Sequence, residues 1–191
     1  MRNVKKISLD SICKPKEEEE ILLGQRVREA RSAAIRYIGV SNRSSGQVRV
    51  HLQQLDMDPD IVESTLLDLI EEGYINDIRI ARRILRERQA GKAESKAALR
   101  NRMARQGIDG SVINDLAEEM MPDEVSAMSL LRNRLSKELQ AISNANRLEK
   151  QRLFGKMSRF LQSRGYSSGC AGKVICDALA GQDDCDFLTE E

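Results

Sequence analysis

The chain has 191 residues, of which 31 are lysine or arginine and 30 are aspartate or glutamate, so its formal net charge is +1. Aromatic residues make up only 3% and tryptophan is absent, which disfavours β-sandwiches and barrels, because these folds rely on aromatic and β-branched side chains. The near-neutral total also argues against indiscriminate binding of nucleic acid, because such binding needs a large positive excess.

Apolar spacing and capping signals predict a succession of helices along the chain. They are expected over about residues 17–38, 44–56, 58–72, 76–91, 93–106, 109–120, 122–142, 146–164 and 168–180. Ser44 with Gln47 has the pattern of a capping box, and Asp58-Pro59 places an N-cap before a proline at the first helical position. Residues 1–16 are expected to form a flexible leader and residues 181–191 an acidic, frayed tail.

The predicted helices fall into three similar triplets when they are aligned without gaps. The aligned columns are Val48, Leu99 and Met157; Leu52, Met103 and Leu161; a turn position at Asp56, Gly107 and Gly165; and Met57, Ile108 and Tyr166. The sequence therefore predicts an all-α fold of three tandem three-helix repeats, which we expect to form an elongated, curved array. The repeats would span residues 17–75, 76–121 and 122–180, the third with a longer first helix or loop.

Four segments resemble the bacterial RecX family in the same order and spacing. Leu69 to Asp77 with Arg79 and Ala81 is similar to the L-x-x-x-G-Y-I-D-D-x-R-x-A segment of that family, and Phe160 to Ser167 is similar to its F-L-x-x-R-G-F-S segment. The other two segments are Arg43-Ser44 with Gln47-Val48, and Gly91 with Leu99 and Gln106-Gly107-Ile108. The chain departs from the family pattern at Glu72, Lys92 and Ser95, so its second repeat is the less typical one.

The resemblance implies a modulator of the RecA recombinase. Members of this family bind along the groove of the RecA–single-stranded DNA filament and usually inhibit strand exchange, ATP hydrolysis and co-protease activity. The chain is therefore expected to be a cytoplasmic, monomeric regulator in homologous recombination, DNA repair and the SOS response, with no cofactor and no catalytic role. The motif residues expected to shape helix ends are Gly73, Tyr74, Asp77, Gly107, Arg164, Gly165 and Tyr166. We expect both tyrosines to pack under the turns that they follow, and Arg164 to cap a helix C-terminus.

The balanced total charge hides six alternating blocks. Residues 1–51, 79–105 and 132–164 carry net charges of +5, +8 and +7, whereas residues 52–78, 106–131 and 165–191 carry −8, −6 and −5. Each repeat is thus basic in its first two helices and acidic in its third.

Helical spacing places several basic residues on common faces. Arg79, Arg83 and Arg86 lie at i, i+4 and i+7, beside a core face expected to hold Ile78, Ala81 and Leu85. The same spacing recurs at Arg152, Lys156 and Arg159, and a like-charged pair stands at Lys96 and Arg100. One interpretation is that these are solvated faces or salt bridges between repeats. The other is a segmented basic ridge that contacts acidic protein surface or the phosphates of single-stranded DNA.

Other classes of function receive less support from the residues. A helix-turn-helix DNA-binding module is the alternative, but its second helix, residues 58–72, carries Glu63, Asp68, Glu71 and Glu72 without lysine or arginine. No catalytic motif occurs, and neither the four cysteines nor His51 have the spacing of a metal site. No segment has the length and apolarity of a membrane span or the pattern of a signal peptide.

Overall fold

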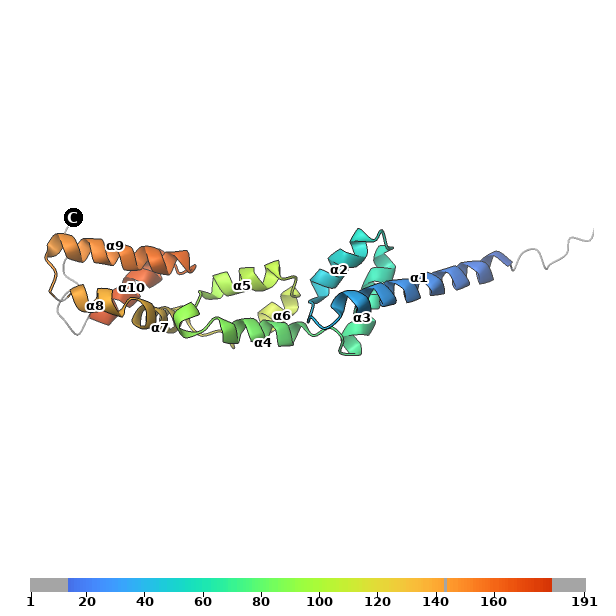
Figure 1. The fold of residues 1–191 in the computed structure, drawn as a ribbon, viewed down its shortest axis with the longest axis horizontal. Helices are drawn as coiled ribbons and strands as arrows, with labels where there is room; N and C mark the ends of the chain where they lie inside the picture. The colour runs from blue at the N-terminus through green and yellow to red at the C-terminus, as the bar shows by residue number, and fades with distance from the viewer. Residues whose placement is uncertain (1–13, 143, 180–191) are drawn as a thin grey trace, which may run out of the picture. The chain divides into compact units, whose positions relative to one another are not determined.

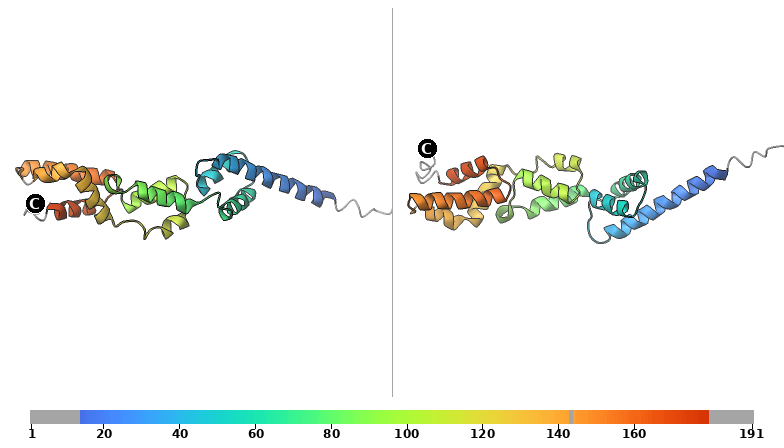
Figure 2. Two further views of the ribbon diagram at one scale, coloured as in Figure 1. Left: turned by 60° about the horizontal axis from the view of Figure 1, so that its bottom comes forward. Right: turned by 90° about the horizontal axis from the view of Figure 1, so that it is seen from above.

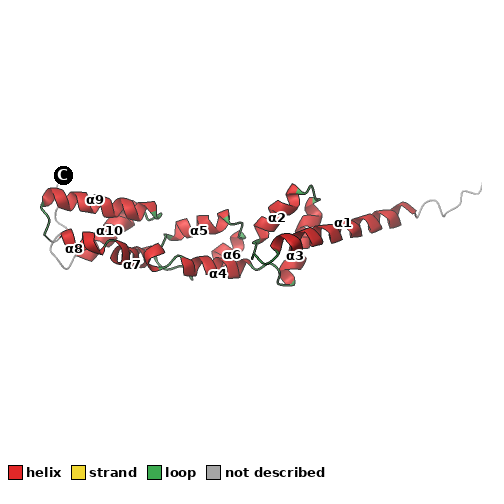
Figure 3. Ribbon diagram, viewed as in Figure 1, coloured by secondary structure: helices red, strands yellow, loops and turns green. Residues whose placement is uncertain are grey.

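The computed structural model describes residues 14–142 and 144–179, and over these ranges every regular element is a helix (Figure 3). The all-α prediction is therefore confirmed for this part of the chain. The chain divides into two compact units between Asn76 and Asp77, and each unit is described by itself. The first unit holds the first repeat, and the second unit holds the other two. The predicted tail, residues 181–191, and most of the predicted leader lie outside the described residues, although α1 begins within residues 14–16.

The first unit is a three-helix domain. It consists of α1 (Lys14–Ile38), α2 (Ser45–Gln54) and α3 (Pro59–Glu71) (Figure 1). The capping box is present: the Gln47 backbone N–H donates to Ser44 Oγ, and the Ser44 backbone N–H donates to Gln47 Oε1, each at 3.3 Å. Asp58 caps α3 by accepting from the backbone N–H of Asp60 at 2.9 Å. The core forms between the three helices and includes Ala34, Ile38, Val48, Leu52, Val62, Leu66, Leu69 and Ile75.

The second unit contains two further helical cores. The helices around the first are α4 (Asp77–Glu87), α5 (Lys96–Arg105) and α6 (Gly110–Asp115), with the short 3-10 helix η2 (Ala90–Lys92) between α4 and α5. The helices around the second are α7 (Asp123–Arg134), α8 (Ser136–Ile142), α9 (Arg147–Ser163) and α10 (Ser168–Leu179). One core in each repeat is what tandem three-helix units require, because each repeat must bury its own apolar faces.

Several predicted helices differ from the observed ones. The helix expected to reach Gly91 ends at Glu87, and the 3-10 helix η2 follows it. The helix expected over residues 122–142 is broken at Leu135, where φ is −125° and ψ is 27°. The break lets Leu135 enter the core while α8 packs on α9, a tertiary requirement that local helix propensity does not contain. The helix expected from residue 93 begins at Lys96, because Ser95 is its N-cap. The helix expected to reach residue 120 ends at Asp115, and Leu116 is its C-cap.

The turn that ends the second helix has the same backbone geometry in all three repeats. Its central residue has a positive φ in all three repeats: 56° at Asp56, 72° at Gly107 and 90° at Gly165. The next residue donates a backbone hydrogen bond to the carbonyl five positions earlier: Met57 to Leu52 at 3.4 Å, Ile108 to Met103 at 3.2 Å, and Tyr166 to Leu161 at 3.3 Å. This is the bonding of a Schellman C-cap, and it confirms the predicted alignment of the turn columns.

The two motif tyrosines have different environments. Tyr166 is buried as predicted, and its hydroxyl donates to Ser126 Oγ at 3.0 Å. Burial raises the pKa of Tyr166 to about 12. The prediction was wrong for Tyr74, which is 49% exposed. The α3 turn has one more residue than the others, because Ile75 bonds the carbonyl of Leu69 six positions back. Ile75 therefore takes the buried place and Tyr74 faces solvent.

Replacing Tyr166 with phenylalanine is expected to lower the free energy of unfolding by about 1 kcal/mol, because a buried hydrogen bond is lost. Tyr74→Phe is the matched control, since its exposed ring should tolerate the same change without measurable effect. Urea denaturation followed by circular dichroism measures both. Equal midpoints for Tyr166→Phe and the unchanged chain would show that the buried hydroxyl contributes nothing to stability.

Candidate partner-binding surface

The α4 helix presents one face to the core and an arginine-rich face to solvent. Its buried residues include Ile80, Ala81 and Ile84, whereas Ile78 is 47% exposed, so the expected core face was wrong at Ile78. Arg79, Arg83 and Arg86 are all exposed, as the i, i+4, i+7 spacing requires. Arg83 lies 3.9 Å from Glu87 one turn later, which is a loose, solvent-exposed pair. The α4 basic stripe, Arg79, Arg83 and Arg86, is thus a solvent-facing set on one helix.

A further arginine of α4, Arg82, has a different role. Its guanidinium contacts the carboxylate of Glu119, with Nη2 to Oε1 at 2.7 Å, and this contact lowers the pKa of Glu119. Other basic-to-acidic pairs also join elements of one repeat: Arg31 with Glu72, Arg49 with Glu63, and Lys156 with Glu138. Some of the opposite charges are therefore paired inside each repeat, whereas the first interpretation had expected solvated faces or salt bridges between repeats.

The α9 basic stripe, Arg152, Lys156 and Arg159, lines one groove of about 700 Å³. Ala141, Ala145 and Leu153 supply apolar walls, and Asn144 and Glu149 complete the lining. Lys156 Nζ lies 2.7 Å from Glu138 Oε1, which lowers the pKa of that carboxyl. Arg159 Nε donates to the carbonyl of Gly155 at 3.1 Å, and this bond holds the guanidinium close to its own helix. The structure thus brings three predicted residues together in one groove. The carboxylate of Glu138 already neutralises part of their positive charge.

The predicted pair on α5, Lys96 and Arg100, is not part of the α9 groove. The Lys96 backbone N–H donates to Asp123 Oδ1 at 2.7 Å, and Arg100 is exposed one turn later. The larger groove beside α5, of about 740 Å³, is instead lined by Arg102 and Arg105, which the sequence did not single out, and by Arg164, which it singled out only as a helix cap. Arg102 and Arg105 share a helix, but their proximity to Arg164 depends on how α5 packs against the end of α9.

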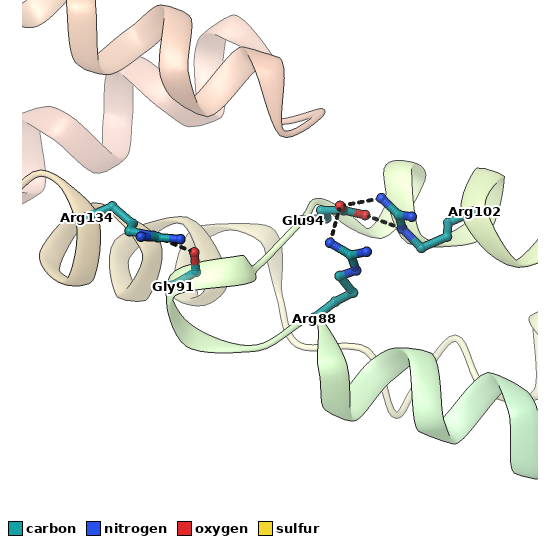
Figure 4. A network of polar contacts seen from close by, with 5 residues as sticks. All are labelled: Arg88, Gly91, Glu94, Arg102 and Arg134. Carbon is teal, nitrogen blue, oxygen red and sulfur yellow. Dashed lines mark hydrogen bonds and ion pairs between the residues drawn. The ribbon is translucent and has the colours of Figure 1, made fainter.

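A buried carboxylate organises the start of α5. Glu94 is only 7% exposed, and its two oxygens accept from Arg102 Nε at 2.9 Å and Nη2 at 2.7 Å (Figure 4). Arg88 Nη1 approaches the same carboxylate at 3.5 Å. The hydrogen bond from Arg102 is the main reason why the pKa of Glu94 is lowered. Nearby, Arg134 Nε donates to the Gly91 carbonyl at 2.9 Å, which ties α7 to η2.

Glu94→Gln is expected to destabilise the protein by about 1–2 kcal/mol at neutral pH, because a charge-assisted pair with Arg102 is lost. Since the folded-state pKa is lowered, the stabilisation from this carboxylate is present above its unfolded pKa and disappears as pH falls through the folded value. The difference in unfolding free energy between the two proteins should therefore shrink on acidification. Urea titrations at several pH values measure it, and a difference independent of pH would contradict the assignment to the ionised pair.

The remaining motif residues hold helix ends together. The Asp77 carboxylate accepts the backbone N–H of Asp109 at 3.1 Å, which links the start of α4 to the N-cap of α6. Arg164 is the C-cap of α9, as predicted; its carbonyl accepts the Ser95 backbone N–H at 3.1 Å, and its guanidinium lies over the Phe160 ring. Gly73, like Gly107 and Gly165, has a positive φ. These residues shape the scaffold that carries the basic stripes.

The described residues also bear on two other kinds of feature, a metal site and a membrane span. No group of three or more histidine, cysteine or acidic side chains within them is arranged to hold a metal ion. None of the described helices combines the length and apolarity needed to cross a membrane. His51 stacks on Tyr37 with ring centroids 4.0 Å apart, and Arg43 also lies over that tyrosine ring.

Residues 30–69 match the sequence model of a protein family, described as the first three-helix domain of RecX. Curated relatives named regulatory protein RecX match most of the chain. The protein of Listeria welshimeri is 24% identical over 178 residues, which is 92% of this chain and 64% of that protein. The protein of Amycolatopsis mediterranei is 26% identical over 155 residues, which is 81% of this chain and 86% of that protein. This chain thus spans just under two thirds of the length of the Listeria relatives.

Solved structures share the fold. A crystal structure of regulatory protein RecX covers 93% of this chain and 81% of its own, with a TM-score of 0.61 and 21% identity. The crystal structure of RecX from Lactobacillus salivarius covers 81% of this chain and 97% of its own, with a TM-score of 0.59 and 20% identity. The predicted resemblance is thereby confirmed, and with it the tandem arrangement of helical repeats.

Proposed function

We propose that this chain, which belongs to the RecX family, regulates the RecA recombinase by binding the RecA–single-stranded DNA filament and inhibiting its ATP hydrolysis, strand exchange and co-protease activity. The observation that carries the proposal is the recurrence of an exposed basic stripe at the same i, i+4, i+7 spacing on α4 and on α9. A filament that carries phosphates at regular intervals is a ligand suited to such a repeated stripe.

Two kinds of surface would make the contacts. The α4 and α9 basic stripes would face phosphates of the single strand or acidic patches of the recombinase. The exposed carboxylates of α3, which include Asp68 and Glu71, would face basic protein surface, because α3 contains no lysine or arginine. Binding several neighbouring subunits at once would hinder the changes that accompany ATP turnover.

The role would be that of a cytoplasmic regulator in homologous recombination, DNA repair and the SOS response. It would act by binding alone, without cofactor or catalysis, and as a monomer along the filament. The helix-turn-helix alternative gains nothing from the structure, because α3, which would be the recognition helix, exposes Glu63, Asp68 and Glu71.

The experiment that tests this function is the ATPase rate of RecA on single-stranded DNA with increasing amounts of the chain. We expect inhibition by the unchanged protein and weaker inhibition by an Arg79→Glu, Arg83→Glu, Arg86→Glu variant. A variant with Arg132, Lys137 and Arg147 changed to glutamate is the control, since it has the same change in charge at exposed positions outside both stripes. An unaltered ATPase rate with the unchanged protein would refute the proposal.

A further inference from the structure

The groove that contains the α9 basic stripe has the features of a site for an acidic segment with apolar residues. Arg152, Lys156 and Arg159 supply three cations, against one lining carboxylate, Glu149, and the neighbouring Glu138. The backbone N–H of Asn146 already donates to Glu149, so that carboxylate is also engaged at the start of α9. Leu153, with Ala141 and Ala145, provides an apolar wall beside the cations. The groove therefore favours a ligand that combines carboxylates with an apolar side chain.

The chain itself contains such a segment directly after α10. Residues 181–191 read G-Q-D-D-C-D-F-L-T-E-E, with acidic side chains at Asp183, Asp184, Asp186, Glu190 and Glu191 and no basic residue. Phe187 and Leu188 follow the first acidic group directly. These residues lie outside the described part of the chain.

The last turn of α10 lies at the same end of the third repeat as one end of the α9 groove. α10 packs against α9 and runs back along it, so the C-terminal end of α10 lies towards the end where α8 joins α9 (Figures 1 and 2). Asn144, Ala145 and Glu149 of the groove belong to that same end. An extended chain covers about 3.3–3.6 Å per residue, so Asp183 can lie up to roughly 14 Å from Leu179 and Asp186 up to roughly 25 Å, enough to pass around a helix about 10–12 Å in diameter.

The spacing of the cations along the groove also matches the spacing of the carboxylates in the acidic segment. Arg152 and Arg159 are seven residues apart on a helix, a rise of about 10 Å. Asp183 and Asp186 are three residues apart, which is also about 10 Å in an extended chain.

We propose that the acidic segment 181–191 binds the α9 groove of its own chain and competes there with polyanions. Its attachment to α10 gives it a high effective concentration at the groove, so weak individual contacts suffice. A ligand with several phosphates displaces the segment, whereas a weak or isolated anion does not. The consequence for binding rests on the proposed function, but the contact itself is a separate claim.

The contact is tested by comparing backbone amide NMR spectra of the full chain with those of a chain that ends at Ala180. A full-length Asp183→Asn, Asp184→Asn, Asp186→Asn variant keeps the length and removes the charges. We expect the amide signals of residues 152–159 to shift on truncation and to shift in the same direction in the asparagine variant. In the full chain they should also move towards the truncated spectrum between about 0.1 M and about 1 M NaCl, as the Debye length falls from about 10 Å to about 3 Å.

Identical α9 spectra in the full and truncated chains, or changes confined to the last turn of α10, would overturn the proposal. Binding of an oligo(dT) strand, measured by fluorescence anisotropy, separates the contact from its consequence. Truncation should tighten that binding by about fivefold, because the stripe is freed for phosphate. If neither form binds the strand but the α9 signals still move, the tail contact is supported and the function proposed for the stripe fails instead.

Discussion

Gly165→Ala is expected to destabilise the protein by about 3 kcal/mol, which combines the strain of a left-handed alanine with overpacking. Gly165 has a φ of +90°, and a Cβ built there would lie 2.7 Å from both Ala98 Cβ and Ser95 Oγ. Ser95 has little room to move, because it is fully buried and caps α5 through the backbone N–H of Ala98. The substitution should therefore strain the α9 turn and disturb the start of α5 together.

Gly73→Ala is the matched control for that prediction. Its φ of +79° imposes similar backbone strain, but no atom lies within 4 Å of a Cβ at that position. We expect a loss of about 1 kcal/mol, the part that comes from backbone conformation alone. Urea denaturation of both variants measures the difference. Equal losses at the two positions would contradict the close approach of α5 to the α9 turn.

Neutralising the α4 basic stripe is expected to reduce the salt dependence of binding to RecA–single-stranded DNA filaments. If Arg79, Arg83 and Arg86 each contact a phosphate, changing all three to glutamine should make the slope of log K against log salt shallower by about 2. At low salt the affinity should fall by about a hundredfold, because three favourable contacts disappear. Anisotropy of the labelled protein at several salt concentrations measures both quantities.

Arg82→Gln on the same helix provides a control for the stripe. Its guanidinium is already paired with Glu119, so its loss should leave the salt slope unchanged. A slope that changes equally per residue for Arg82 and for the stripe would indicate a general charge effect. A slope unchanged by all four substitutions would place the phosphate contacts elsewhere on the chain.

The parts of the fold that depend on local chemistry were predicted from the sequence. The capping box at Ser44 needs only a side chain and the backbone three residues on, and the turns at Gly107 and Gly165 need a residue that tolerates positive φ. The break at Leu135 was missed because its cause is the packing of α8 on α9. Tyr74 was misplaced because one additional residue in the α3 turn exchanges which side chain faces the core.

The candidate surface shows the same division between local and tertiary causes. The spacing of Arg152, Lys156 and Arg159 is a property of one helix, so the sequence identified a shared face before the groove was known. The pairing of Arg82 with Glu119 joins residues 37 positions apart, and nothing in the local pattern distinguishes Arg82 from Arg83. The contact between the buried Glu94 and the partly exposed Arg102 depends likewise on the loop that follows η2.

Binding of the chain to the recombinase filament can be measured by co-sedimentation with preformed RecA–single-stranded DNA filaments at low and high salt. We expect the protein to pellet with filaments near 0.1 M salt, to be released as salt rises, and to remain in the supernatant with RecA or duplex DNA alone. A chain that stays in the supernatant with filaments at low salt would show that it does not bind them.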